Sequence, residues 1–418
     1  MFVSLLKRLW KRTLLLILFF SSIMTVQTDS TWETSSEGEY YPYQVNYLSV
    51  HELTDRARFQ AILSTDYQQA YDLWQDIQLF ELYNGSVPEG ELDGEALTIM
   101  ASGGTPYINY DMLIWRRNMM NAPGKFSKSV FTDYEMLKNL SHRLHYILNF
   151  DNLLENHSET IARAIRRGSS LTPYYETALA ELSAIDTDFP VMDTACTSLL
   201  LDYLNTDWYI IVILCLSFFG LFSTAAQQRI TNQLLTSKTG IRKYAIYQVL
   251  AALVITACGM IIYYAVAIFA CASTGPGQIA WGLPIQCILG EHFDTFNIYY
   301  AMNVREYFLL MAGVKILFCL LLVSIISLLS ALSRNNLISG LLVIAFCAGL
   351  VLLQSKWDWG DLLIGNGHIL LQELCYFNIN GTMIHYLAIY ALSIGLLIPV
   401  MMGLTVLLAK PAAKGWVR

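Results

Sequence analysis

A chain of 418 residues with 55% apolar side chains, 14% charged ones and a mean hydropathy of +0.43 is too apolar for an ordinary soluble enzyme, because soluble domains carry about 25% charged residues. The formal charge of −7 is unevenly distributed: residues 28–206 hold 26 acidic and 11 basic side chains, whereas the rest of the chain holds 7 acidic and 15 basic ones. These figures exclude a disordered, collagen-like or nucleic-acid-binding chain and indicate an integral membrane protein with one large polar domain.

The chain begins with a basic segment and a short apolar run. Lys7, Arg8, Lys11 and Arg12 precede residues 13–28, which are a few residues short of a full membrane span. A retained anchor helix and a cleavable secretory signal both fit this pattern. We favour the anchor, because no small-x-small triplet of the usual kind follows the run and because the basic side chains can snorkel and lengthen the usable helix.

Residues 28–206 form the predicted polar domain, and the pattern there is mainly helical. Apolar residues recur at intervals of three and four over residues 53–82 and 134–165. We expect a third helix over residues 173–204 that continues directly into the next span. The glycine-rich stretch 88–104 is predicted to be a loop.

Five further stretches are long and apolar enough to cross a bilayer as helices: 208–226, 244–271, 307–332, 335–355 and 383–409. Together with the N-terminal helix they make six spans. A cytoplasmic N-terminus puts 12 basic and no acidic residues on the inner segments, and all 33 acidic residues outside. This asymmetry is what the positive-inside rule predicts.

The expected fold is therefore an all-α polytopic membrane protein of six transmembrane helices. Its predicted parts are an inner N-terminus and first span (1–27), a mainly helical extracytoplasmic domain (28–206), the remaining five spans (207–410) and a cytoplasmic tail (411–418). We expect the protein to reside in the plasma membrane as a multi-pass chain.

Signatures of catalysis are missing from the sequence. No Gly-x-x-x-x-Gly-Lys-Ser/Thr, Gly-x-Ser-x-Gly or His-Glu-x-x-His pattern occurs, so we expect neither an enzyme nor a bound cofactor. His142 and His145 lie one helical turn apart. Because no third ligand is indicated, two solvent-facing histidines are a better interpretation than a metal site.

Lys315 is the one charged residue placed within a predicted span. It either belongs to a polar pathway, with Asp207 or Asp202 as partners, or snorkels from about two helical turns inside the membrane to the outer interface. The sequence leaves both interpretations open.

The inner segment between the second and third spans, residues 224–244, contains an amphipathic pattern. Ile230, Leu234 and Ser237 share one helical face, and Gly240 is expected to end the helix as a C-cap. We expect a short docking helix at the inner interface rather than a plain topogenic loop. Its predicted contact residues are Arg229, Ile230, Leu234, Leu235, Ser237, Lys238, Gly240, Arg242 and Lys243.

The residues from Leu234 to Tyr244, Leu-Leu-Thr-Ser-Lys-Thr-Gly-Ile-Arg-Lys-Tyr, resemble the segment between spans two and three of ABC-2-type transporter permeases of Gram-positive bacteria. Residues 303–307, 327–335 and 357–382 are similar to outer and inner segments of the same family, the last at the place of short re-entrant helices. The resemblance implies the membrane-spanning permease subunit of an ATP-driven exporter. It also implies a separate cytoplasmic ATPase that carries ATP and magnesium, and a second permease chain, identical or different.

Two departures from the family pattern concern this coupling segment. Gln227 and Gln228 stand where the family usually carries glutamate, and Gln248 stands where it carries lysine. Ile241 also separates the glycine from the arginine. These differences fit a chain that is the weaker half of a heteromeric pair. The alternative function is a non-transporting surface scaffold or receptor that uses the acidic outer domain.

Overall fold

The computed structural model describes residues 9–10, 13, 56–82, 97–98, 107–108, 136–142, 144–168, 171–192, 194–205, 207–223, 240–274, 279–293, 300–333, 335–356, 376–379 and 382–416. The chain divides into two compact units. The first comprises Met1–Ser30, Leu153–Asp186 and Ala195–Arg418, and the second comprises Thr31–Asn152 and Thr187–Thr194. The first unit thus combines the apolar helices with part of the sequence between residues 28 and 206.

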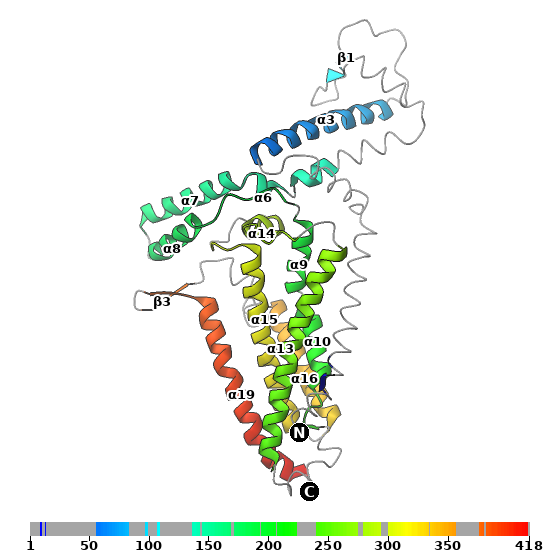
Figure 1. The fold of residues 1–418 in the computed structure, drawn as a ribbon, viewed down its shortest axis with the longest axis vertical. Coiled ribbons are helices and arrows are strands. Elements are labelled where there is room, and N and C mark those ends of the chain that lie inside the picture. The colour runs from blue at the N-terminus through cyan, green and yellow to red at the C-terminus, as the bar shows by residue number, and fades with distance from the viewer. Residues whose placement is uncertain are drawn as a thin grey trace. The chain divides into compact units, whose positions relative to one another are not determined.

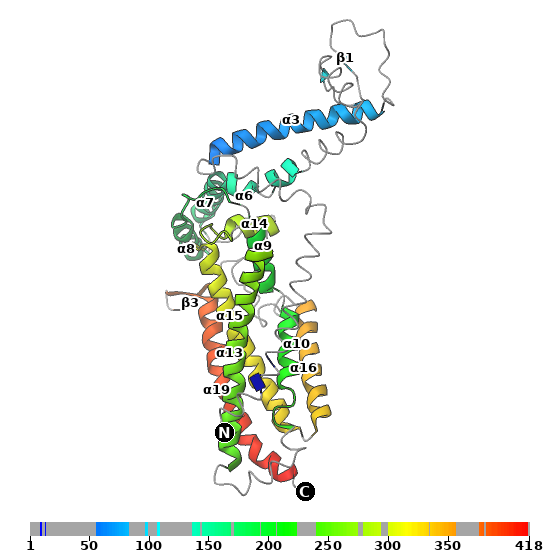
Figure 2. The same ribbon diagram turned by 45° about the vertical axis from the view of Figure 1, so that its right-hand side comes forward.

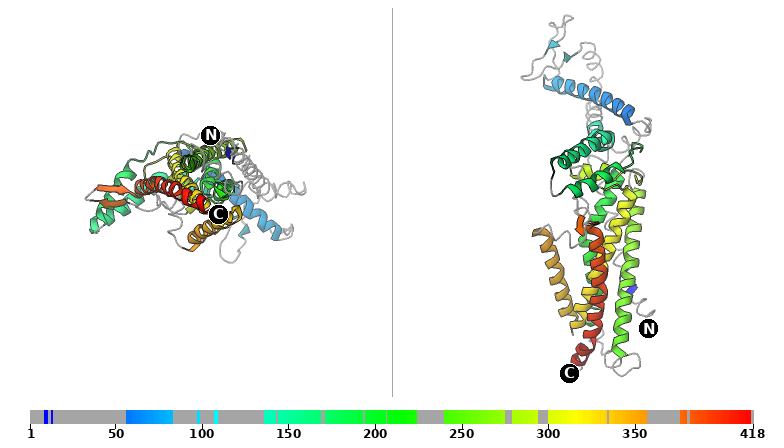
Figure 3. Two further views of the ribbon diagram at one scale, coloured as in Figure 1. Left: turned by 90° about the horizontal axis from the view of Figure 1, so that it is seen from below. Right: turned by 90° about the vertical axis from the view of Figure 1, so that its left-hand side faces the viewer.

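Three helices of the first unit are long and apolar enough to cross a membrane. They are α13 (Gly240–Thr274), α15 (Val304–Leu332) and α19 (Tyr386–Trp416). Their apolar segments of 33, 29 and 24 residues exceed the roughly 20 that a bilayer requires. The three helices pack pairwise and run alongside one another in every view (Figure 1, Figure 2 and Figure 3). Helices of spanning length at the third, fourth and sixth predicted spans are therefore confirmed.

Two shorter apolar helices, α10 (Asp207–Phe218) and α16 (Asn336–Lys356), lie side by side (Figure 2). The second of these covers the predicted fifth span. The prediction of one uninterrupted helix over 208–226 is wrong, because α10 ends at Phe218 and a turn follows over residues 219–222. Gly220, a poor helix former, lies within that turn. Of the predicted first span, only Thr13 lies among the described residues.

The turn after α10 is held by polar side chains from two of the long helices. The hydroxyl oxygen of Ser330 in α15 accepts hydrogen bonds from the backbone N–H groups of Phe222, at 2.9 Å, and Ser223, at 3.4 Å. The Nε2 amide of Gln248 in α13 donates to the carbonyl of Leu221 at 3.0 Å. Since an interrupted helix in an apolar bundle leaves backbone groups without partners, these side chains make the interruption possible.

The same turn is also joined to α16. The hydroxyl of Ser339 donates to the carbonyl of Phe219, and the hydroxyl of Ser223 donates to Oδ1 of Asn336 at 2.6 Å. The segment leading towards residue 224 is therefore fastened to α13, α15 and α16 at once. Neither the break nor its side-chain partners can be recognised from hydropathy, because averaging over a window of spanning length hides single serine and glutamine residues.

The predicted single helix over residues 173–204 is two helices, α8 (Thr172–Ser183) and α9 (Ala195–Asn205). Pro190 explains the break between them, because proline cannot donate to the helix ladder and disfavours the helical conformation of the residue before it. The hydroxyl of Thr197 in α9 accepts a hydrogen bond from the Ala280 N–H at 2.9 Å, which ties α9 to the segment after α13.

The segment before α15 contains the short helix α14 (Gln286–Phe293). Asn303 caps α15 in a capping box: its side chain accepts from the Glu306 N–H at 2.9 Å, and the Glu306 carboxylate accepts from the Asn303 N–H at 3.0 Å. This reciprocal arrangement satisfies two donors at the helix start and fixes where α15 begins.

A β-hairpin precedes α19. Strands β3 (Tyr376–Ile379) and β4 (Thr382–His385) pair antiparallel. The expectation of re-entrant helices over 357–382 is therefore wrong for its final part, while residues 357–375 lie outside the described residues. The prediction that the last span starts at residue 383 is also corrected, because residues 383–385 belong to β4 and the helix starts at Tyr386.

The second unit is built around α3 (Arg56–Leu82), which confirms the helix predicted from the pattern of residues 53–82. The prediction of one helix over residues 134–165 is wrong. Helix is interrupted by turns at residues 144 and 149, which separate a helical stretch over 136–142, α6 (His145–Leu148) and α7 (Phe150–Arg167). Most of α7, from Leu153 onward, belongs to the first unit. Strands β1 (Leu97–Thr98) and β2 (Tyr107–Ile108) form a second small antiparallel pair.

Arg56 fastens the start of α3 within the second unit. Its guanidinium donates to the Asp151 carboxylate at 2.9 Å and to the Thr187 carbonyl at 2.7 Å, and it lies 4.4 Å from the centre of the Phe189 ring. Three segments far apart in the sequence thus meet on one cation, which combines a charge-assisted hydrogen bond with a cation–π contact.

Candidate ligand-binding site

The predicted coupling segment is described only at its end. Arg229, Ile230, Leu234, Leu235, Ser237 and Lys238 lie outside the described residues, as do Gln227 and Gln228. Gly240 begins α13 with a φ of 62°, in the left-handed region that glycine adopts without strain. Arg242 and Lys243 follow in the first turn of α13, and both are exposed.

The two predicted pathway residues belong to different helices. Lys315 lies in α15 and is only 2% exposed, so its side chain is enclosed by protein and does not snorkel along the surface of the bundle. Asp207 is the first residue of α10, and the side chains of Asp207 and Asp202 lie outside the described part. A partnership between them and Lys315 therefore stays a prediction.

The side chains of His142 and His145 are exposed, as the solvent-facing interpretation expects. Within the residues that the structure describes, no group of three or more His, Cys, Asp or Glu side chains is placed to hold a metal ion.

Sequence reasoning missed a cavity of about 790 Å³ in the first unit. Leu309, Leu310 and Leu317 of α15 form one wall, and Leu387 and Ala391 of α19 form another. Both walls belong to the first few turns of helices that are long enough to span a membrane. The volume lies within the range of about 300–1,000 Å³ that small-molecule sites occupy.

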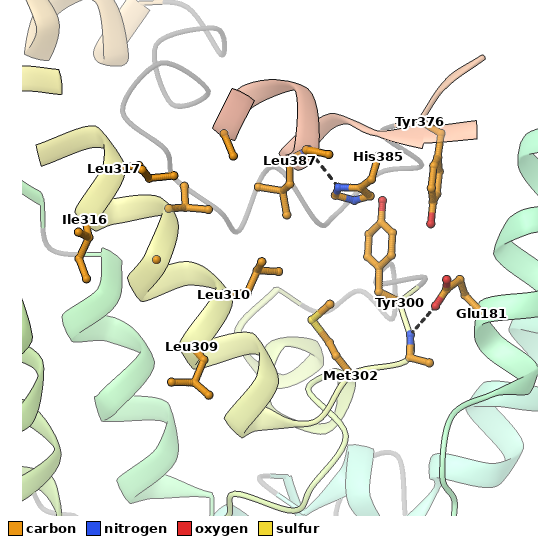
Figure 4. Close-up of a pocket in the computed structure, with 15 residues that line it drawn as sticks. Glu181, Tyr300, Met302, Leu309, Leu310, Ile316, Leu317, Tyr376, His385 and Leu387 are labelled. Atoms are coloured by element: carbon orange, nitrogen blue, oxygen red, sulfur yellow. Dashed lines mark hydrogen bonds between the residues drawn. The ribbon is translucent and has the colours of Figure 1, made fainter. Parts of the chain in front are cut away.

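Polar and aromatic side chains line one end of this cavity, and four segments supply them. Glu181 comes from α8, Tyr300 from the segment just before α15, Tyr376 from β3 and His385 from β4 (Figure 4). The rings of Tyr300 and Tyr376 lie 5.9 Å apart, and that of His385 lies 4.7 Å and 5.3 Å from them in edge-to-face contacts. We refer to these four residues as the polar end of the cavity.

Two hydrogen bonds position the segment that carries Tyr300. The Glu181 carboxylate accepts from the Ala301 N–H at 3.2 Å, and Nε2 of the buried Gln286 in α14 donates to the Tyr300 carbonyl at 2.7 Å. Residues from α8, α14 and the hairpin thus position the polar end. Its geometry depends on the packing of these elements against one another.

His385 is held as a neutral ring. The Leu387 N–H donates to its Nδ1 at 3.0 Å, which places the proton of the neutral imidazole on Nε2. Burial lowers the pKa of His385 below its ordinary value, because the surroundings disfavour the charged form. The Nε2 atom is buried and has no hydrogen-bond partner among the described residues.

Tyr376 also responds to its surroundings. Burial, and secondarily the negative charge of Glu181, raises the pKa of Tyr376 to about 12. The phenol therefore stays neutral, and Glu181 supplies the formal charge at the polar end. A carboxylate beside aromatic rings at one end of an apolar cavity can fix the orientation of a bound ligand.

Nothing in the sequence marks these four residues. Glu181 is one of 26 acidic residues in its region, and the other three residues each stand next to another aromatic residue, in segments without a recognisable motif. No protein-family model matches the chain, and comparisons with curated proteins and with solved structures find no match. The site therefore has to be interpreted from its own chemistry.

Proposed function

We propose that this chain is the membrane-spanning permease subunit of an ATP-driven exporter that works with a separate cytoplasmic ATPase. The observation that carries the proposal is the segment ending at the start of α13. There the stretch that resembles a permease coupling segment finishes in Gly240, with a left-handed φ, and in the exposed Arg242 and Lys243, directly before an apolar helix of spanning length.

In this proposal the chain crosses the plasma membrane six times, with both termini in the cytoplasm and residues 28–206 outside. The distribution of charge supports the orientation, because 12 basic and no acidic residues fall on the inner segments. ATP and magnesium bind to the partner ATPase, and a second permease chain completes the membrane part. The chain itself contributes the bundle, the coupling surface and the outer region.

The decisive experiment changes the apolar residues of the coupling segment. Leu234→Asp together with Leu235→Asp places two carboxylates where the ATPase is expected to bury leucine, and burying an unpaired polar group costs a few kcal/mol. The purified chain, co-expressed with a candidate partner ATPase of the ABC type, should then lose that subunit or its ATP turnover while still inserting into the membrane.

A matched control keeps the leucines. Asn232→Asp together with Gln233→Glu adds the same negative charge to the same segment at polar positions, and we expect ATPase association to be retained. If the leucine variant binds the ATPase and turns over ATP like the parent, Leu234 and Leu235 do not form the coupling surface. If the unmodified chain binds no ATPase, the exporter proposal fails and a surface scaffold is favoured.

A further inference from the structure

The cavity between α15 and α19 has a defined chemical polarity. Its walls are aliphatic, with Leu309 and Leu310 of α15 facing Leu387 of α19, and its charged group, Glu181, lies at one end (Figure 4). Such a site suits a molecule with an apolar tail and a single compact head. The apolar tail of such a molecule would pack against the aliphatic walls, and its head group would determine which amphiphile binds best.

The head that fits the polar end is a cation. A carboxylate attracts positive charge, and the faces of tyrosine rings attract ammonium groups through their quadrupoles. Glu181, Tyr300 and Tyr376 bring these two attractions together, with the two rings 5.9 Å apart and inclined at 45°. His385 is neutral and braces both rings through edge contacts, so it does not compete for the carboxylate.

An ordinary phospholipid fits this end poorly. Its phosphodiester would lie close to the Glu181 carboxylate, and a buried phosphate needs Arg or Lys, or backbone donors, to offset its charge. None of the described residues that line the cavity is Arg or Lys. The charge of the site thus selects against anions and zwitterions that carry phosphate.

We propose that this cavity is a binding site for membrane-partitioning cationic amphiphiles, in which Glu181 and the rings of Tyr300 and Tyr376 hold an ammonium head and the α15–α19 walls hold the tail. The inference goes beyond the exporter function and does not depend on it. Binding is a property of the chain alone and requires neither an ATPase nor turnover.

The test uses one photoreactive probe and four competitors with the same tail. Purified full-length chain in uncharged maltoside micelles is labelled with a trimethylammonium probe that carries a diazirine in a twelve-carbon tail, and labelled peptides are mapped by mass spectrometry. We expect labels on the segments around Leu309 and Leu387. Dodecyltrimethylammonium should displace the probe at concentrations about tenfold lower than dodecanol, dodecanoate or dodecylphosphocholine, since it alone adds a cation–carboxylate contact without an added anion.

Two substitutions separate head from tail. Glu181→Gln keeps an acceptor for the Ala301 N–H and removes the charge, so the tenfold preference for the ammonium competitor should disappear. Glu176→Gln, an exposed carboxylate on the same helix, should leave the preference intact. Gly313→Leu fills the cavity from α15, where an added Cβ meets no atom within 4 Å, and should lower labelling by the probe. Gly349→Leu on α16, equally open but outside the cavity, is its control.

Three results overturn the inference. Equal displacement by dodecanol would make the cavity a general apolar slot, and equal displacement by dodecylphosphocholine would make it a phospholipid site. Labels confined to other segments would place the probe elsewhere. The comparison of competitors on the unmodified chain decides the matter even if a variant fails to fold, and thermal unfolding of each variant shows whether it has folded.

Discussion

The apolar helix bundle of this protein encloses individual polar side chains, and Lys315 is one of them. Lys315 is 2% exposed in the middle of α15, a mainly apolar helix that also carries buried serines. Enclosing a lysine costs free energy unless its charge is compensated, and residues of this kind in membrane helices commonly mark a pathway or a coupled motion. The enclosed position favours the pathway interpretation over the snorkelling one that the sequence left open.

Lys315→Met removes the charge and roughly preserves length. The thermal midpoint of the variant shows whether it has folded, because removing one member of a buried polar contact can itself cost stability. Under the exporter proposal, ATP turnover of the reconstituted complex should fall roughly tenfold. The matched control is Arg305→Met, an exposed cation near the start of the same helix, which should change neither quantity. Normal turnover in the Lys315 variant would remove this residue from the mechanism.

The buried histidine at the polar end of the cavity makes stability depend on pH. The folded state lowers the pKa of His385 below 6.5, so the unfolded chain binds the proton first as pH falls. Stability should therefore decline as pH drops below about 6.5 towards the folded-state pKa. His385→Gln, which can still accept from the Leu387 N–H, should show a smaller fall in thermal midpoint between pH 7 and 5.

His157 in α7 is the internal comparison for this effect. Burial lowers its pKa as well, so its contribution has the same sign. We expect His157→Gln to remove a separate part of the acid sensitivity and the double variant to remove both parts. A fall in midpoint that is identical in the His385 variant and the parent would contradict the buried, neutral state of that ring.

At the scale of elements, the informative feature is the interrupted helix α10. Its terminal turn accepts a hydrogen bond from α13 and donates hydrogen bonds to α15 and α16, so the segment that leads towards the predicted coupling helix is fastened to all three helices. In the exporter proposal, this turn transmits movement between the cytoplasmic face and the bundle. Such a role requires a rigid connection, and side-chain hydrogen bonds in an apolar setting provide one.

Ser330→Ala tests how much this connection contributes. It removes the acceptor for two backbone N–H groups and should cost about 1–3 kcal/mol of stability, with faster amide hydrogen exchange at residues 222 and 223. Ser324→Ala is a strict control in the same helix, since that buried hydroxyl only donates to the Leu320 carbonyl one turn away. Its cost should stay within about 0.5 kcal/mol. Equal effects of the two changes would show that the turn is not held by Ser330.

At the scale of the whole molecule, the prediction concerns orientation. In a cysteine-free background, which requires replacing the 8 native cysteines, Ser237→Cys should react with a membrane-impermeant reagent only after the cells are opened. Glu135→Cys should react on intact cells. We expect this result because short loops rich in Lys and Arg stay on the cytoplasmic side of the membrane. Labelling of both positions from the same side would contradict the six-span arrangement.

Hydropathy and charge determined much of this protein without any coordinates. The apolar stretches over residues 244–271 and 307–332 predicted α13 and α15 nearly to their ends, because a bilayer demands about 20 apolar residues and little else in a protein does. The three- and four-residue spacing over residues 53–82 likewise predicted α3. These helices follow from local composition, because the hydrophobicity of each residue and its spacing along the chain are enough to predict them.

The breaks, the hairpin and the cavity were decided only by tertiary structure. The end of α10 at Phe218 depends on acceptors and donors from three other helices, and β3 pairs with β4 through backbone groups that hydropathy does not weigh. Glu181, Tyr300 and His385 meet across more than 200 positions of sequence. The hydropathy and spacing of residues along the chain do not predict which distant side chains come into contact. The free energy that brings these side chains together arises from packing between elements and not from the local sequence of each element.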